Sequence, residues 1–141
     1  MIITEVWIAS CSASTEYDIR YTCEKAFDGD ETDGGWVAKN REYIGAWIRI
    51  NLDGVYRLTK VMLMSRHHGD QHFKDISLEF LYGEPVDFTL DDTNEWQTIE
   101  FEGIGRDIIT NYVNISAISV YRGDDNGFTE LKVFGRAAGM G

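Results

Sequence analysis

Basic residues are scarce in this chain. Its 141 residues include 13 Lys and Arg against 24 Asp and Glu, which gives a formal net charge of −11. A field of this sign repels phosphate groups, so nucleic acids are not expected partners and a membrane surface is a poor one. Apolar runs long enough to cross a bilayer are also missing, and the first residues lack the basic and apolar segments of a signal peptide. If the protein is secreted, we expect this chain to be a processed or recombinant form.

Cysteines and catalytic motifs are equally scarce. Two cysteines in 141 residues exclude a small domain held together mainly by disulfides. Cys11 and Cys23 could form a short-range disulfide of an extracellular domain, or stay as two buried thiols in a cytosolic one. The sequence has no Gly-x-Ser-x-Gly elbow, no phosphate-cradling glycine loop and no His-Glu-x-x-His pair. We therefore expect a protein that is not an enzyme.

Apolar residues alternate with polar ones along much of the chain, which is the period of a β-strand rather than of a helix. Ile48, Ile50 and Leu52, for example, share one face of a strand. We expect strands over residues 2–9, 46–52, 60–65, 76–80, 86–90, 99–101, 112–121 and 130–134, turns between them (one at 53–54), and a short helical turn at 23–27. This order predicts one all-β domain over residues 1–136, an antiparallel sandwich or barrel, with a flexible tail at 137–141.

Four segments, taken in order, resemble one known family. They are a first strand ending near residues 9–10, the turn AFDGDETDGGW at 26–36, the pair GAWIRINLDGVYRLTKV at 45–61 and the segment GFTELKVFG at 127–135. Together they are similar to the discoidin family, the coagulation-factor C-type domain. The resemblance implies a galactose-binding-domain-like jelly-roll β-sandwich of about eight antiparallel strands. It further implies a non-catalytic, extracellular adhesion or carbohydrate-binding module, and it favours a disulfide between Cys11 and Cys23.

The turn at 26–36 is rich in oxygen-bearing side chains, and a hard cation such as Ca²⁺ prefers about six to eight oxygen ligands. Its spacing differs from that of the helix-flanked calcium loop. By the resemblance, a structural calcium would be held by the carbonyl oxygens of Lys25, Asp30 and Thr129 and by the side chains of Asp28, Thr32 and Glu130. The alternative is that Asp28 caps the turn through its own backbone while Glu130 is solvated or paired with a lysine. Calcium would staple distant parts of the chain together and would not bind the sugar.

Loops at one end of such a sandwich are the expected binding surface, because a rigid scaffold presents them without strain. By the resemblance these loops are 15–22, 38–45 and 66–74. They combine aromatic rings with Arg, Asn, Asp and His side chains, which suits a sugar that stacks its apolar face and hydrogen-bonds through its hydroxyls. The residues expected to bind the ligand are Tyr17, Arg41, Tyr43, Arg66, His67, His68 and Lys74, with Arg66 the first candidate.

The sugar itself stays open. Fucose-binding members of the superfamily have an Arg directly after a central strand and a later basic residue, positions that Arg66 and Lys74 match. They also have an early His, which this chain lacks, and an acidic residue where this chain has His68. A transition-metal site is a further alternative, because His68 and His72 are four positions apart, but the segment is expected to be a loop without a third ligand.

The leading hypothesis is a lectin-like module that recognises glycans or glycoproteins at a cell surface or in the matrix. Binding at one site would be weak, and repetition in a longer multidomain protein or a homo-oligomer would strengthen it. The alternatives are a protein-interaction domain that uses the same loops, a phospholipid-binding domain with apolar loop residues such as Tyr17, Ile19 and Ile44, and a structural domain without a ligand.

Overall fold

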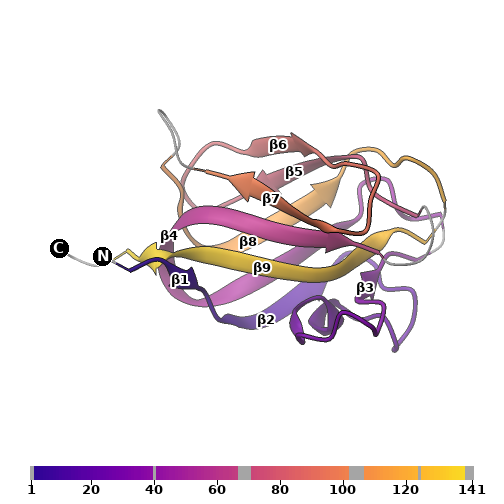
Figure 1. The fold of residues 1–141 in the computed structure, drawn as a ribbon, viewed down its shortest axis with the longest axis horizontal. Coiled ribbons are helices and arrows are strands. Elements are labelled where there is room, and N and C mark those ends of the chain that lie inside the picture. The colour runs from indigo at the N-terminus through magenta and orange to yellow at the C-terminus, as the bar shows by residue number, and fades with distance from the viewer. Residues whose placement is uncertain (1, 40, 67–70, 102–106, 124, 139–141) are drawn as a thin grey trace.

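The computed structural model describes residues 2–39, 41–66, 71–101, 107–123 and 125–138 (Figure 1). Its elements are β1 (Thr4–Glu5), β2 (Ile8–Ala13), the 3-10 helix η1 (Cys23–Phe27), β3 (Trp36–Val37), β4 (Trp47–Ser65), β5 (Asp75–Glu79), β6 (Val86–Thr89), β7 (Trp96–Glu100), β8 (Ile109–Ala117) and β9 (Gly127–Ala137). All strand pairs among these residues are antiparallel. The predicted all-β jelly-roll class is confirmed, with nine strands in the described part of the chain.

The strands form two layers that face each other across the core (Figure 1). One layer holds β2, the first half of β4, β8, β5 and β6, because β4 pairs with both β2 and β8 over residues 48–51 and β8 pairs with β5. The other layer holds β1, β9, the second half of β4 and β7, because β4 pairs with both β9 and β7 over residues 60–64. The sandwich is therefore one hydrogen-bonded sheet that β4 carries from one layer into the other.

The 19-residue strand β4 bends sharply to make this passage. A straight strand of that length would span roughly 60 Å, which is more than a domain of this size accommodates. The pairing of β4 with β8 shifts register between Asn51 and Tyr56, and its pairing with β9 shifts between Leu58 and Lys60. Figure 1 shows the two halves of β4 running in opposite directions in the two layers. Residues 53–54, predicted as a turn, begin this bend without interrupting the strand.

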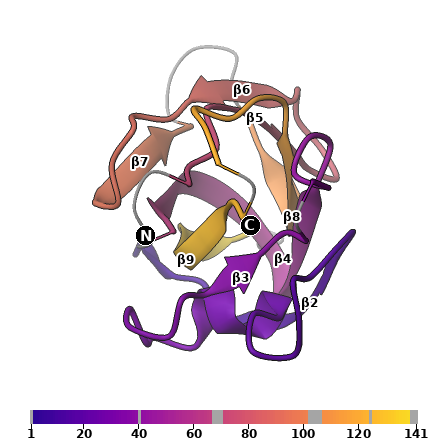
Figure 2. The ribbon, with the colours of Figure 1, turned by 90° about the vertical axis from the view of Figure 1, so that its right-hand side faces the viewer.

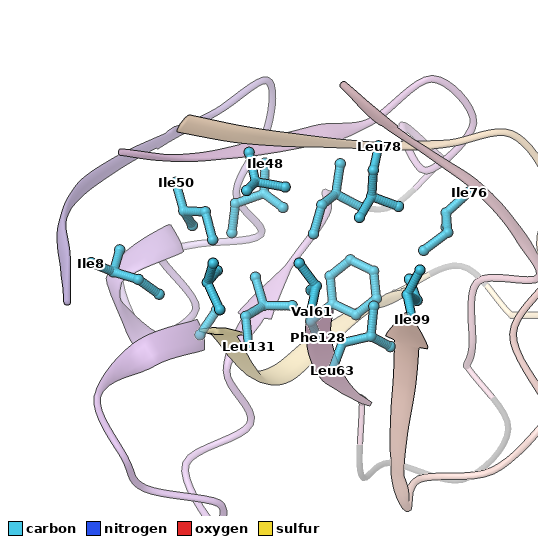
Figure 3. Packing of buried hydrophobic residues seen from close by; sticks show 14 of the residues in the cluster. Ile8, Ile48, Ile50, Val61, Leu63, Ile76, Leu78, Ile99, Phe128 and Leu131 are labelled. Atoms are coloured by element: carbon cyan, nitrogen blue, oxygen red, sulfur yellow. The ribbon is translucent and has the colours of Figure 1, made fainter. Parts of the chain in front are cut away.

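Alternating apolar residues from both layers fill the space between them (Figure 3). The side chains that meet there and are almost fully buried include Ile48, Ile50, Val61, Leu63, Ile76, Leu78, Ile99, Phe128 and Leu131. Trp36, Phe73 and Phe128 add an aromatic cluster, with ring centroids 5.3–6.0 Å apart. This core fixes the strand ends from which the loops project.

Several predicted strands have different bounds in the structure, among them those at 99–101 and 130–134, which are β7 at 96–100 and β9 at 127–137. Residues 2–9 are divided between β1, which pairs with β9, and the start of β2, which pairs with β4. The strand expected at 112–121 is β8 at 109–117. It begins earlier because Ile109 pairs with Arg57, and it ends earlier because the N–H groups of Ile118 and Ser119 donate to the carbonyl of Asp75. The helical turn predicted at 23–27 is confirmed as η1.

The last strand carries the chain to Ala137, and the N–H of Ala138 donates to the carbonyl of Val55 at 3.0 Å. Most of the predicted tail, residues 139–141, lies outside the described residues. The described residues contain no helix that could span a membrane.

A disulfide joins Cys11 in β2 to Cys23 in η1. The N–H of Cys23 also donates to a carboxylate oxygen of Glu16 at 2.7 Å, which fixes the start of η1. Of the two alternatives that the sequence left open, the structure therefore has the disulfide. The bond attaches η1 to β2, and η1 leads directly into the acidic turn at 28–35.

Replacing both cysteines with alanine should destabilise the domain by about 3 kcal/mol, because the bond closes a loop of a size for which that loss is typical. The measurement is urea unfolding of the wild type and of the Cys11→Ala/Cys23→Ala double variant. Equal unfolding midpoints would show that the bond contributes nothing to stability.

Candidate functional site

Several loops come together at the end of the sandwich that faces the viewer in Figure 2, where β4 ends and β9 begins. The N–H of Arg66, directly after β4, donates to the carbonyl of Gly127, the first residue of β9. The loop at 15–22 is tied to β3, since the N–H of Tyr17 donates to Val37 and the N–H of Val37 donates to Tyr21. Residues from three separate parts of the chain are thus held together by backbone hydrogen bonds.

Arg66 lies at the centre of this end and is only 8% exposed. Its Nη1 donates to the side-chain oxygen of Gln71 at 2.5 Å and to the backbone carbonyl of Asp125 at 2.6 Å. Its Nε is buried and has no hydrogen-bond partner among the described residues. The guanidinium therefore crosslinks two loops, while its buried Nε has no partner among the described residues.

Two tyrosines stand beside this guanidinium. The Arg66 Cζ lies 5.6 Å from the centre of the Tyr21 ring, which in turn meets the Tyr17 ring edge to face with centroids 5.8 Å apart. Tyr17 is 39% exposed, so part of its ring faces solvent. The Cζ of Arg20 also lies near Tyr21, at 5.3 Å from the ring centre. The arrangement offers an aromatic wall next to hydrogen-bonding groups.

Buried acceptors without partners lie next to Arg66 along the chain that precedes β9. The side-chain oxygens Oδ1 of Asp125 and Oδ1 of Asn126 are both buried, and neither has a hydrogen-bond partner in the described structure. Asn126 is held in place through its Nδ2, which donates to the carbonyl of Arg122 at 3.1 Å. Unpaired buried polar atoms are costly. A hydrogen-bond donor that reached these two oxygens, from water or from a ligand, would remove this cost.

His72 links the backbone of Arg66 to Asp92. Its Nδ1 lies 2.8 Å from a carboxylate oxygen of Asp92, and its Nε2 lies 3.0 Å from the carbonyl oxygen of Arg66. A carbonyl and a carboxylate both accept hydrogen bonds, so a ring nitrogen that carries a proton donates to one of them. Hydrogen bonds from His72 and Arg122 hold the pKa of Asp92 below its usual range. His72 thereby helps to position the backbone of Arg66.

The structure groups only some of the predicted ligand-binding residues. Tyr17 and Arg66 meet through Tyr21, whereas Tyr43 packs against the hydrophobic core and Lys74 places its ammonium 5.5 Å from the Tyr121 ring centre. Arg41 is exposed, at a positive φ of 69°. His67 and His68 lie outside the described residues.

Three residues beside Arg66 were not among the residues predicted to bind ligand: Tyr21, Gln71 and Asp125. Their loops and turns were recognised from the sequence, but nothing in a loop sequence indicates which side chains turn inward.

A second polar site lies where the turn at 28–35 packs on β9. Gly35 adopts a φ of 68°, and a Cβ there would lie 2.0 Å from the carbonyl oxygen of Phe128 and 2.5 Å from the Cα of Thr129. A glycine is therefore required for the turn to approach the strand this closely. The approach brings the carboxyl groups of Asp28 and Asp33 to the buried carboxyl of Glu130.

The electrostatics of this carboxylate cluster, Asp28, Asp33 and Glu130, are unfavourable without a cation. Burial, followed by the charge of Asp28, raises the pKa of Glu130 to about 8. Burial and a hydrogen bond with Asp28 raise the pKa of Asp33 to about 6. Glu130 is only 2% exposed, and its Oε2 has no hydrogen-bond partner in the described part of the chain. Converging carboxylates around an unpaired buried oxygen are a donor set that suits a hard cation.

The remaining predicted metal-binding residues lie around this cluster. Asp28 caps the turn through one oxygen, which accepts the N–H of Asp30 at 2.9 Å, as the alternative interpretation expected. Asp30 accepts both the N–H and the hydroxyl of Thr32, at 2.8 and 2.5 Å. Lys25 belongs to η1 and Thr129 to β9. Asp33 also belongs to the cluster, although it was not predicted to bind the metal. The turn contains several acidic residues, and the sequence does not indicate which of them points inward.

Without a cation, the domain should lose stability as the pH rises from about 4.5 to about 8, because the pKa of Glu130 is raised in the folded state and ionising it there costs more than in the unfolded chain. Glu130→Gln cannot ionise and should become progressively more stable than the wild type over this range. Thermal unfolding midpoints in chelator across the range check this.

The matched control for this prediction is Glu95→Gln, which removes an exposed carboxylate at the start of β7 and should follow the wild-type curve. If Glu130→Gln and the wild type show the same dependence of stability on pH, ionising Glu130 does not destabilise the folded state.

Comparisons with known proteins agree with this fold. Residues 10–131 match the F5/8 type C domain, and no curated protein matches the chain. The family 32 carbohydrate-binding module of NanJ from Clostridium perfringens, solved with galactose, has a TM-score of 0.79 at 19% identity, over 94% of this chain and 99% of that chain. A second module from Clostridium perfringens, CpGH89CBM32-5, solved with GalNAc-β-1,3-galactose, has a TM-score of 0.74 at 19% identity, over 88% and 93%.

A lectin from striped bass serum (Morone saxatilis), described as a fucolectin, has a TM-score of 0.75 at 15% identity, over 94% of this chain and 48% of that chain. The fold is thus shared with modules from bacteria and from a fish. The resemblance drawn from four sequence segments is confirmed, since the family match covers most of the domain that the structure describes. The chain belongs to the F5/8 type C domain family, the discoidin family.

Proposed function

We propose that this chain is a non-catalytic carbohydrate-binding module whose ligand site is the loop end around Arg66. The observation that carries the proposal is the partly exposed Tyr17 ring, which forms a wall with Tyr21 beside the immobilised Arg66 guanidinium. A pyranose presents an apolar C–H face that stacks on an aromatic ring and hydroxyls that both donate and accept. The loop end offers partners for each of these features.

The fixed geometry of the site favours selective binding. Arg66 is held by Gln71, by the carbonyl of Asp125 and, through its own carbonyl, by His72. A side chain that is already immobilised loses little entropy when a ligand arrives. The unpaired oxygens of Asp125 and Asn126 are acceptors for hydroxyl donors, directly or through a bridging water.

Galactose-containing glycans are the first ligands to test, since two similar structures were solved with galactose and with GalNAc-β-1,3-galactose. Glycans on cells or in an extracellular matrix are the partners that this function implies, and the disulfide suits an oxidising compartment. A single shallow site gains strength when several copies act together, so a longer protein or an oligomer would use it best.

We also propose that the carboxylate cluster holds a structural calcium ion. Asp28, Asp33 and Glu130 would supply carboxylate oxygens, and Lys25, Asp30, Thr32 and Thr129 are neighbouring sources of carbonyl and hydroxyl oxygens. The ion would neutralise the charges that burial makes unfavourable and would link the turn at 28–35 to β9. The unpaired, buried Oε2 of Glu130 supports this assignment.

A glycan array with calcium present should show selective binding to one family of sugars. Tyr17→Ala removes only a partly exposed ring and should weaken binding about tenfold, the loss expected when a stacking contact disappears. Arg66→Ala should abolish binding, and its unfolding midpoint reports whether the fold survives. Titration calorimetry with the best array ligand gives both affinities.

Tyr82→Ala is the matched control, because Tyr82 is an exposed tyrosine near the start of β8, and it should bind like the wild type. Silence across the array would oppose the carbohydrate function and turn attention to a protein partner. If both Tyr17→Ala and a folded Arg66→Ala bind the ligand as tightly as the wild type does, the ligand binds at another place on the domain.

Millimolar calcium should raise the unfolding midpoint of the wild type by several degrees, since an ion that binds only the folded state stabilises it. The gain should disappear in Glu130→Gln and persist in Glu95→Gln. Differential scanning calorimetry with calcium, magnesium or chelator measures it, and an unchanged wild-type midpoint would contradict the calcium site.

A further inference from the structure

A groove of about 600 Å³ lies on the side of the sandwich, between η1 and the strands β1, β2 and β9. Pockets that hold small ligands have volumes of roughly 300–1,000 Å³. Apolar side chains, Val6, Ile8 and Phe27, form part of its lining. Neither Arg66 nor Tyr17 lines it, so it is separate from the loop end.

Trp7 is the exposed aromatic residue of this groove. It is 72% exposed, although its neighbours Val6 and Ile8 are buried. The alternation of the chain turns these two inward and leaves the indole on the outer side. A large flat ring that faces solvent beside an apolar groove is a stacking surface that the fold itself does not use.

The groove also carries negative charge. The exposed residues Glu5 and Glu24 line it, beside Asp28 and Glu130 of the carboxylate cluster and a single lysine. That lysine, Lys132, places its ammonium 4.8 Å from the centre of the Trp96 ring.

Two further observations bear on these carboxylates. Glu130 is almost fully buried, and its Oε2 lacks a partner in the described structure. A carboxylate oxygen of Glu24 lies within 4.8 Å of the sulfurs of Cys11 and Cys23, at the η1 side of the groove. Glu5 in β1 and Glu24 in η1 thus belong to two different elements that line the groove.

We propose that this groove is a second ligand site, selective for a protonated amino sugar of the glucosamine class. Trp7 stacks on the apolar face of the pyranose, and Glu5 and Glu24 pair with the ammonium group. Calcium in the carboxylate cluster would engage Asp28 and Glu130 and leave these two glutamates for the amine. The carbohydrate class of the ligand rests on the proposed function, whereas the location and the selectivity for positive charge do not.

The test is titration calorimetry with a β-1,4-linked glucosamine trisaccharide and with its N-acetylated counterpart, which has the same ring skeleton without the charge, both in the presence of calcium. The wild type should bind the charged sugar at least about tenfold more tightly. Trp7→Ala should lose about tenfold in affinity for it. Glu5→Gln/Glu24→Gln should reduce the preference for the charged sugar and the salt dependence of its binding.

Trp7→Ala separates this site from the loop end, and two controls exclude general attraction to an acidic protein. Tyr82→Ala and Glu95→Gln should bind the amino sugar like the wild type. Equal affinity for the two trisaccharides, or full binding by Trp7→Ala, would overturn the proposal. So would equally tight binding of a lysine tripeptide. If the loop end binds no glycan at all, binding that depends on Trp7 would still stand.

Discussion

The pairing between β4 and β9 is the interaction on which both polar sites depend. It runs from Tyr56 opposite Ala137 to Ser65 opposite Phe128. At its last step the N–H of Arg66 reaches Gly127, which sets the guanidinium at the loop end. Three positions further along β9, Glu130 pairs with Met64 and faces the acidic turn. The register of this strand pair thus positions both Arg66, directly after β4, and the buried Glu130 of β9. A shift of the pairing by one residue would displace both side chains.

Much of this architecture was predictable because the sheet is half buried. Alternation of the kind seen at Ile48, Ile50 and Leu52 requires one face toward a core, and the structure buries all three. Strand ends were less predictable, because they depend on partners far away in the sequence. β8 starts at Ile109 because Arg57 and Tyr82 both pair with it, and no local pattern indicates that. The bend of β4 likewise depends on the turn chemistry near Asp53 together with the need to fit a long strand into a small domain.

The sites show the same division. Arg66 and Glu130 could be chosen from the sequence because the family resemblance points to an Arg directly after a recognisable strand and to a Glu within the last one. Tyr21, Gln71 and Asp33 could not, because an exposed-looking loop residue becomes part of a site only through the backbone that turns it inward. Lys74 and Tyr43 illustrate the converse, since their ring and core contacts come from tertiary packing that residue type does not reveal. The Trp7 groove is a joint product of β1, β2, η1 and β9 and has no signature in any one segment.

The two chain ends lie together at the end of the sandwich away from the loop end (Figure 1). β1 and β9 are neighbouring antiparallel strands, with Thr4 opposite Gly135 and Glu5 opposite Phe134. Tension applied through both ends would therefore open this pair one hydrogen bond after another, which resists force less than shearing many bonds at once. The next bond in line joins Val6 to Val133, beside the groove and three residues from Glu130. A mechanical load on a tethered domain would thus reach the groove and the carboxylate cluster before it reached the loops that surround Arg66.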